Sequence, residues 1–337
     1  MRVLSPGRLV AVGAILLAVV VAAAWATPSR SFLIVPDPAK PLAEHVKVEG
    51  EKPADAGGIY YVDVIVRKAS ILERILPPAR PDGSALVPAH SITPPGTSLE
   101  ERRRQNANQM TRSQEIAAAV ALKAYGSKVT IENRGILVSA VAPDGPAQAA
   151  DVRATDIVVA VDGKSVRTPA QLRAAIAKHR IGDKVVLDIR RNGKSLRLTT
   201  TTVDSPTEPG RPIVGIQVDQ AATIKLPLEV KIDLGGVGGP SAGLAFALDI
   251  LEELGRNVDR GYRVAATGQL ELDGTVTPIG GVTQKTIGAK RAGAEVFLVP
   301  AGDNAADARR EAHGLRIIAV ESFQQALRAL ATLPKKR

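Results

Sequence analysis

The spacing of hydrophobic and polar positions changes several times along this chain of 337 residues, and its first element is an apolar run. Residues 9–26 form 18 uncharged, mostly apolar positions, with Arg2 and Arg8 ahead of them. This length fits a transmembrane helix, and the positive charge ahead of it predicts that residues 1–26 anchor the chain with its N-terminus in the cytoplasm. Residues 24–26, Ala-Trp-Ala, are similar to a signal-peptidase site, so secretion after cleavage stays open.

Two segments of different character follow the apolar run. Residues 27–58 are rich in Pro, Lys and Glu without sustained periodicity, which predicts a linker. β-Branched and aromatic residues fill 59–66 almost continuously, as in a buried strand, and a helix is predicted from Ser98 to Tyr125. The chain is therefore expected to begin folding at about residue 59.

Residues 127–205 show short strands around one helix. Strands are predicted at 135–141, 156–163 and 184–190, and a helix at 169–178. Two Gly-Lys-Ser triplets, at 163–165 and 193–195, lie between strands and lack the first glycine of a phosphate-binding loop. They predict hairpin turns, and no ATPase domain is visible in the sequence.

Residues 210–334 combine strands, glycine-rich turns and helices. Strands are predicted at 213–218, 228–234, 264–270 and 295–300, and helices at 241–254 and 283–292. Together with the strand-rich region before it, this pattern predicts an α+β fold.

Ser241 is the first residue with an unusual setting. It opens the helix predicted at 241–254, directly after Gly-Gly-Val-Gly-Gly-Pro at 235–240. A helix-capping serine is the simpler interpretation, but Leu244 stands where a capping box carries Glu or Gln. Glycine-rich backbone also lets N–H groups converge on a developing oxyanion. From this segment alone, a cap and a nucleophile both stay open.

Lys285 supplies a partner 44 positions later. It lies in the first turn of the helix predicted at 283–292, where the helix dipole disfavours another positive charge and lowers the lysine pKa. Burial beside Ser241 would lower the pKa further, towards a neutral amine that accepts the serine proton. The chain has no cysteine, and none of its four histidines lies in an obvious catalytic turn.

Four motifs in this region occur in the order and spacing of the Lon family of serine–lysine proteases. They are Gly-Pro-Ser-Ala-Gly, Ala-Thr-Gly-Gln-Leu, Pro-Ile-Gly-Gly-Val-Thr-Gln-Lys and Val-Phe-Leu-Val-Pro, within about 212–333. The resemblance implies that Ser241 is the nucleophile, Lys285 the general base and Thr267 a hydroxyl that orients Lys285. It also implies an oxyanion loop at Gly238, Gly239 and Ala242. Many ATP-dependent members carry an acidic residue where this chain has Gly238.

Residues 127–205 resemble a bacterial PDZ domain. The resemblance implies a groove between the first strand and the helix, in which a peptide segment or C-terminus adds as an extra strand. The residues that it assigns to this groove are Arg134, Gly135, Ile136, Leu137 and Val138. Asp151 and Thr155 stand where these domains usually carry glycine, which predicts a reshaped turn. A small β-rich module without a ligand stays open as the alternative.

Composition limits the partners. The net charge of +10 is spread along the chain, and aromatic residues make up only 3%, so no stretch offers the stacking surface that nucleic-acid binding uses. The absence of cysteine removes thiol catalysis, disulfides and zinc–thiolate sites. Neither a cofactor nor a metal is expected.

The whole arrangement resembles the membrane-anchored, PDZ-containing Lon-like proteases of bacteria. It implies an ATP-independent serine endopeptidase that acts on proteins or peptides outside the cytoplasmic membrane. The resemblance further implies that 59–126 can complete the protease fold, with the PDZ domain as an insertion, and that the chain can form a homo-oligomeric ring such as a hexamer. The alternative from another class is a membrane-anchored PDZ scaffold without catalysis. A chymotrypsin-like enzyme would need a His–Asp–Ser set, and no histidine lies in a suitable motif.

Overall fold

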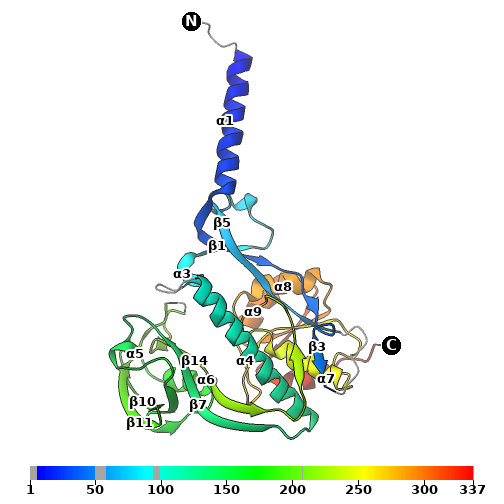
Figure 1. The fold of residues 1–337 in the computed structure, drawn as a ribbon. Coiled ribbons are helices and arrows are strands. Elements are labelled where there is room, and N and C mark those ends of the chain that lie inside the picture. The colour runs from blue at the N-terminus through cyan, green and yellow to red at the C-terminus, as the bar shows by residue number, and fades with distance from the viewer. Residues whose placement is uncertain (1–5, 50–57, 94–98, 207, 337) are drawn as a thin grey trace.

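The first element of the structure is a helix that stands apart from the rest (Figure 1). The computed structural model describes residues 6–49, 58–93, 99–206 and 208–336. Along α1 (Pro6–Ala26) apolar side chains such as Leu16 and Leu17 are exposed. Over the described ranges no helix has the length and hydropathy to cross a membrane, so the transmembrane helix expected at 9–26 is not supported. Arg2 lies outside the described residues.

The segment predicted as a linker is folded where the structure describes it, so that prediction is wrong. It contains β1 (Pro28–Pro36), β2 (Lys40–Pro41) and β3 (Val46–Val48). β1 lies between β5 (Val64–Ser70) and β6 (Ala85–Pro88) in an antiparallel sheet. The short helices α2 (Ile71–Ile75), η1 (Pro77–Ala79) and α3 (Ala89–Ile92) complete this part. Its apolar residues are scattered rather than periodic, yet Leu33, Leu42 and Val46 are completely buried.

A five-stranded sheet forms the centre of the main domain, which we define as residues 28–125 and 226–336. Its order is β2-β4-β16-β19-β20, with β4 (Ile59–Tyr61), β16 (Val264–Ala266), β19 (Val296–Pro300) and β20 (Arg316–Val320). The pairs β4–β16, β16–β19 and β19–β20 are parallel. The helices α7 (Gly243–Glu253), α8 (Val282–Arg291) and α9 (Asp303–Glu311) lie between these strands along the chain, and α10 (Phe323–Ala331) follows β20. The α+β expectation is therefore corrected to a mixed α/β fold, because parallel neighbours require helical crossovers.

Alternation along the strands gives the sheet two buried faces. On β19, Val296 and Leu298 point into the core that contains α7 and α10, whereas Phe297 and Val299 point into the core with α8 and α9. α4 (Leu99–Tyr125) packs against α7 and adds a run of small buried residues to the first core. That core includes both Leu42 and Leu333, so segments from both ends of the chain form it.

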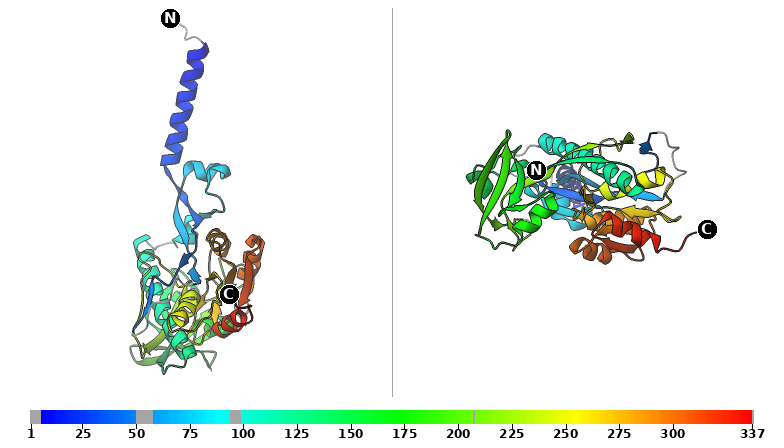
Figure 2. Two further views of the ribbon diagram at one scale, coloured as in Figure 1. Left: turned by 90° about the vertical axis from the view of Figure 1, so that its right-hand side faces the viewer. Right: turned by 90° about the horizontal axis from the view of Figure 1, so that it is seen from below.

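A second unit, the inserted module, lies beside the main domain between α4 and β15 (Val230–Ile232) (Figure 2). It has its own core, which includes Ile136, Val158, Leu172 and Leu187. The sheet order is β11-β10-β8-β7-β14, with β9 paired to β8. Its elements are β7 (Thr130–Val141), α5 (Pro146–Ala149), β8 (Ile157–Val161), β9 (Lys164–Ser165), α6 (Pro169–Ile176), β10 (Lys184–Arg191), β11 (Lys194–Thr201), β12 (Val203–Asp204), β13 (Pro212–Ile213) and β14 (Ile216–Lys225).

The chain enters the module through β7 and leaves it through β14, and these two strands pair antiparallel over their whole length. Both Gly-Lys-Ser triplets lie at hairpin turns, as predicted. The turns place Gly163 and Gly193 at φ of 74° and 80°, each after a residue that also has positive φ. This geometry suits a two-residue hairpin and leaves no helix start to hold a phosphate.

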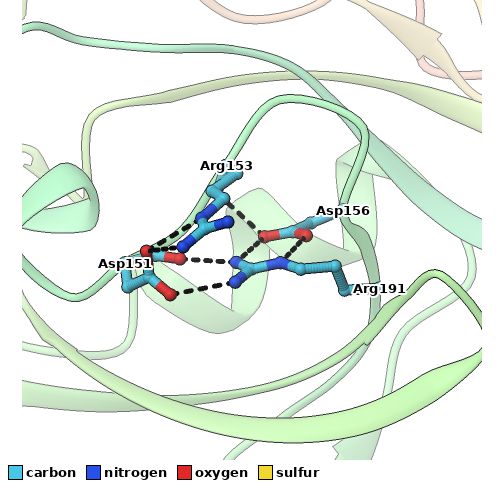
Figure 3. Close-up of polar contacts among 4 residues, drawn as sticks. All are labelled: Asp151, Arg153, Asp156 and Arg191. Atoms are coloured by element: carbon cyan, nitrogen blue, oxygen red, sulfur yellow. Dashed lines mark hydrogen bonds and ion pairs between the residues drawn. The ribbon is translucent and has the colours of Figure 1, made fainter.

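The turn at Asp151 and Thr155 keeps the backbone that glycine would adopt. Asp151 and Thr155 have φ of 62° and 76°, so two residues that are not glycine adopt a left-handed backbone conformation. Figure 3 shows what holds the turn in place: Arg191 donates to Asp156 at 2.7 Å and to Asp151 at 2.9 Å, and Arg153 also donates to Asp151. Asp156 is completely buried, and the Thr155 N–H donates to the Val138 carbonyl at 2.8 Å.

Replacing Thr155 with glycine should stabilise the module. The side chain is exposed, so its removal loses little packing, while a β-branched residue at positive φ stores about 1–2 kcal/mol of strain. We expect a gain of about 1 kcal/mol in thermal unfolding of the whole protein, and a smaller gain for Thr155→Ala. A loss of stability in Thr155→Gly would mean that the hydroxyl or methyl group supports the turn.

Candidate active site

Ser241 lies two residues before α7, not in its first turn as predicted. The helix begins at Gly243, and its N-cap is Ala242, which makes no side-chain cap bond. The helix-capping interpretation of Ser241 is therefore wrong in this structure. The Ser241 carbonyl instead accepts from the Gly268 N–H at 2.8 Å, which ties the serine to the loop after β16.

Lys285 lies in the first turn of α8, as predicted. Gly281 caps the helix with φ of 69°, a left-handed conformation that suits glycine, and its carbonyl accepts from the Lys285 N–H at 3.0 Å. The Lys285 side chain is only 3% exposed. A lysine in this position is held away from water and close to the positive end of its helix.

The structure brings together the three side chains that sequence reasoning selected from 241 to 285. The Lys285 ammonium donates to Ser241 Oγ at 2.7 Å and, more weakly, to Thr267 Oγ1 at 3.4 Å. Thr267 is completely buried, and its hydroxyl donates to the Ser241 carbonyl at 3.1 Å. Thr267 thus contacts both residues and limits how each can move.

Burial sets the charge of this lysine. Desolvation lowers the pKa of Lys285 to about 8, and the negative charge of Asp63 opposes part of that shift. With a pKa near 8, a useful fraction of the side chain is neutral amine close to neutral pH, and this form can accept a proton from the Ser241 hydroxyl.

Asp63 was missed by sequence reasoning. The strand predicted at 59–66 breaks between β4 and β5, and Asp63 sits in that break. Its neighbour Val64 lies 3.5 Å from where a side chain at Gly281 would begin, so the break packs on the first turn of α8. Burial raises the pKa of Asp63, whereas Lys285 lowers it. The one sequence feature that could have indicated Asp63 is that a single acidic residue interrupts the apolar run at 59–66.

Helix α4 holds the glycine-rich loop. The Asn106 carbonyl accepts from the Gly239 N–H at 2.9 Å, and the Ser113 hydroxyl donates to the Pro240 carbonyl at 3.1 Å. Both residues were missed, because nothing in the sequence near residue 110 indicates contact with a loop 130 residues away. The Gly239 N–H is already engaged in this bond. Of the three backbone N–H groups that were expected to stabilise an oxyanion, those of Gly238 and Ala242 therefore remain.

The PDZ-type groove differs from expectation. Gly135 to Val138 were expected to offer a free strand edge, but β7 pairs with β8 on one side and with β14 on the other. The edge that should accept a peptide is thus occupied by the chain itself. The Arg134 side chain is exposed, and its carbonyl accepts from Arg190 at 2.7 Å. Gly135 is needed for packing, since a Cβ there would lie 2.7 Å from the Val158 carbonyl on β8.

Among the described residues, no group of three or more His, Asp or Glu side chains could hold a metal ion.

Comparison with known families agrees with both regions. Residues 123–202 match the PDZ domain, and residues 217–332 match the C-terminal proteolytic domain of Lon protease (S16). The chain combines a PDZ domain with a Lon-type proteolytic domain. This homology supports a serine peptidase.

Curated relatives match only in part. Lon protease 2 of Bacillus subtilis is 37% identical over 98 residues, which are 29% of this chain and 17% of that protein. Lon protease 1 of Sorangium cellulosum is 37% identical over 120 residues, which are 33% of this chain and 14% of that protein. A probable periplasmic serine endoprotease of Chlamydia trachomatis, DegP-like, is 41% identical over 76 residues, 23% of this chain and 15% of that protein. The chain therefore spans about a sixth of the length of these relatives.

Among solved structures, the PDZ domain of an SdrC-like protein from Listeria monocytogenes is 22% identical with a TM-score of 0.24. It covers 26% of this chain and 92% of its own.

Proposed function

We propose that this chain is a serine endopeptidase in which Ser241 is the nucleophile and Lys285 the general base. The observation that carries the proposal is the 2.7 Å contact between Lys285 Nζ and Ser241 Oγ, made by a buried lysine whose pKa is lowered to about 8. Protein and peptide substrates follow from the Lon-type proteolytic domain.

The mechanism starts from the neutral amine. Lys285 takes the proton of the Ser241 hydroxyl as Oγ attacks the scissile carbonyl, and the developing oxyanion is stabilised by backbone N–H groups near Gly238 and Ala242. The lysine then gives that proton to the leaving amine, and the acyl-enzyme forms. Neutral Lys285 next removes a proton from water, whose oxygen attacks the ester, and returns the proton to Ser241 Oγ. Atoms and charge are restored at the end of the cycle.

We further propose that the enzyme needs neither nucleotide nor metal. The support is that nucleophile, base and orienting hydroxyl all come from one chain and are positioned by its own α4, α7 and α8. Hydrolysis of casein by the purified protein should have the same rate with or without ATP and with or without EDTA. A rate that rises with ATP or disappears with EDTA would contradict this mechanism.

The site of action is also a proposal. The basic residues ahead of an apolar run at 9–26 favour export of the main domain and the inserted module across the cytoplasmic membrane. In cells whose cytoplasmic membrane is intact but whose outer layers have been permeabilised, an added protease should then digest the protein, whereas a cytoplasmic marker protein should survive. Protection of both would place the enzyme inside.

A non-catalytic PDZ scaffold is the second candidate. The observation in its favour is that the inserted module has a hydrophobic core and a sheet of its own, as a separate binding unit would. Such a scaffold would not react at Ser241. A fluorophosphonate probe that labels the wild type but not Ser241→Ala, shown by intact mass, would exclude it.

A further inference from the structure

Large apolar side chains are exposed around the end of α1 that joins the main domain. There α2 packs against α1, and the Ile71 N–H donates to the Thr27 carbonyl at 3.0 Å (Figure 2). We call residues 25–30 and 64–80 the collar. Its exposed apolar side chains include Ile65, Val66, Ile71, Ile75 and Leu76. A group of exposed apolar residues marks an interaction surface, so the collar is a candidate for one.

The collar carries an excess of positive charge. Its one acidic residue is Glu73, and its basic residues are Arg30, Arg67, Lys68, Arg74 and Arg80. The Glu73 side chain is only 2% exposed, and Arg67 donates to it at 2.5 Å, so its charge is already matched. Lys68 and Arg74 are exposed and form no ion pair with any side chain that the structure describes. Two cations are therefore available to an anionic partner.

A hollow of about 340 Å³ lies beside these cations at the end of α1. It is lined by Trp25 of α1 and by Arg67 and Lys68 of β5, and also by Glu73, which Arg67 holds. The Trp25 side chain is 54% exposed. Indole rings favour the boundary between the acyl and headgroup layers of a membrane, and lysine and arginine bind phosphate. The hollow therefore offers both contacts that suit the phosphate end of a phospholipid.

Helix α1 helps to decide between a membrane and an acidic protein as the partner. Its exposed apolar residues at 15–17 and 19–21 follow one another at about 100° and so lie on several sides of the helix. Along α1 into the collar, the side chains change from apolar to Trp25 and then to basic. This is the order from the acyl layer of a bilayer outwards to its phosphates, whereas an acidic protein would match the charges alone.

The collar is joined closely to the catalytic pair. β1 pairs with β5 and contacts α8, the helix that carries Lys285. Just after β1, the Ala39 N–H donates to the Gly288 carbonyl of α8 at 3.1 Å. Gly288 leaves no room for a side chain beside the Asp37 carbonyl, so the chain runs directly against the helix. A partner that holds the collar therefore also sets the orientation of Lys285 and Ser241.

We propose that the collar binds the surface of a bilayer that contains anionic phospholipids. Headgroup phosphates contact Lys68 and Arg74 and occupy the hollow beside Trp25, while Ile75 and Leu76 enter the headgroup layer. This contact is additional to α1, which needs only to enter the acyl layer beside the collar. The main domain is then held in one orientation, with the catalytic pair at a constant height above the membrane. The inference rests on the proposed action at the cytoplasmic membrane and does not depend on hydrolysis.

A fluorescent label at position 75 tests the contact in the full chain. The natural chain has no cysteine and Ile75 is 69% exposed, so Ile75→Cys accepts a nitrobenzoxadiazole label at one place without loss of packing. The protein is reconstituted into nanodiscs of dioleoylphosphatidylcholine, alone or mixed equally with dioleoylphosphatidylglycerol. Quenching by a lipid with a nitroxide on its headgroup should be at least about threefold stronger with phosphatidylglycerol, because each basic residue near an anionic surface strengthens binding about fivefold.

Two matched controls separate the collar from the rest of the molecule. Ile181→Cys places the same label at an exposed position of the inserted module, which lies at the opposite end of the molecule from α1 (Figure 1), and should be quenched in neither disc. Lys68→Glu/Arg74→Glu should lower the quenching at position 75 to its level in phosphatidylcholine. Lys184→Glu/Lys194→Glu makes the same charge change on exposed residues of the inserted module and should leave that quenching unchanged.

Salt provides a test without substitutions in the collar charges. At about 1 M salt the Debye length is about 3 Å, so the difference between the two kinds of disc should disappear. This measurement keeps the proposal testable if circular dichroism shows that Lys68→Glu/Arg74→Glu does not fold.

Equal quenching in the two kinds of disc at low salt, or equal quenching at positions 75 and 181, would overturn the proposal. Absence of quenching in every disc would overturn it as well, as would equal effects of the two charge variants. Failure of the peptidase proposal is seen separately, as absence of peptide hydrolysis by the wild type. Failure of the export proposal is seen as protection from an added protease in permeabilised cells.

Discussion

Replacing Ser241 with alanine or Lys285 with methionine should each lower kcat/KM for a fluorogenic peptide at least about a thousand-fold. The serine hydroxyl is a weak nucleophile unless a base takes its proton, and Lys285 Nζ at 2.7 Å is the group in position to do so. Because the two side chains act as one unit, the double variant should be no worse than either single variant. Lys285→Arg should be equally inactive, since a guanidinium stays protonated.

Controls separate chemistry from folding. Lys290→Met changes an exposed lysine of the same helix and should leave kcat/KM unchanged. Thr267→Ala should lose less activity than either dyad variant, because nucleophile and base remain while one orienting hydroxyl is gone. An active Lys285→Met enzyme would show that another residue is the base, and the Ser–Lys assignment would have to be withdrawn.

The Lys285→Met variant should also be more stable than the wild type at pH 7. Burial lowers the pKa of Lys285 from 10.5 to about 8, so the folded state holds its proton less tightly than the unfolded state. This destabilisation is complete below pH 8 and disappears as the pH rises through 10.5. Its removal should raise the free energy of unfolding by up to roughly 3 kcal/mol. A variant that is inactive yet harder to unfold cannot have lost activity through misfolding.

The pH dependence carries the second large effect. Because only neutral Lys285 is a base, kcat/KM should rise about tenfold per pH unit up to an apparent pKa of about 8 and then level off. The Asp63 carboxylate raises the pKa of Lys285. Asp63→Asn should therefore move the whole profile to lower pH and make the enzyme more active than the wild type at pH 6.

Other charges near Asp63 come from Asp37 and Lys40, which bond to each other at 2.7 Å. Asp303→Asn, at the exposed start of α9, is the matched control and should leave the midpoint unchanged. An Asp63→Asn profile that coincides with the wild-type profile would show that the carboxylate does not act on Lys285. A profile shifted to higher pH would show that the aspartate acts in the opposite sense.

The sequence was informative where chemistry depends on local backbone. Ser241, Thr267 and Lys285 each follow or precede glycine-rich turns whose geometry is short-range, and the positions of α6 and α8 follow from local periodicity. Contacts between distant segments could not be read in this way. Asn106, Ser113 and Asp63 reach the site only through tertiary packing, and no local pattern distinguishes them from other polar residues of a helix or loop.

The same reason explains the two largest misreadings of the fold. Leu42 and Val46 lie in a Pro- and Lys-rich stretch, and only the apolar surface of α7 and β4 makes their burial favourable. The sequence predicts an ordinary strand at 213–218 in the region of β14, because it shows that a strand exists but not which strand edge it will pair with. Its partner β7 precedes it by about 80 residues, with the whole inserted module between them.

The joining of both chain ends in one core also sets the order in which the protein can mature. The contacts of the inserted module lie within one continuous stretch, so it can fold while the rest of the chain is still being made. The main domain must wait for α10 and Leu333, which close the core that already holds Leu42. The core of the main domain is therefore completed only after the inserted module has been made, so the two units are expected to become stable one after the other.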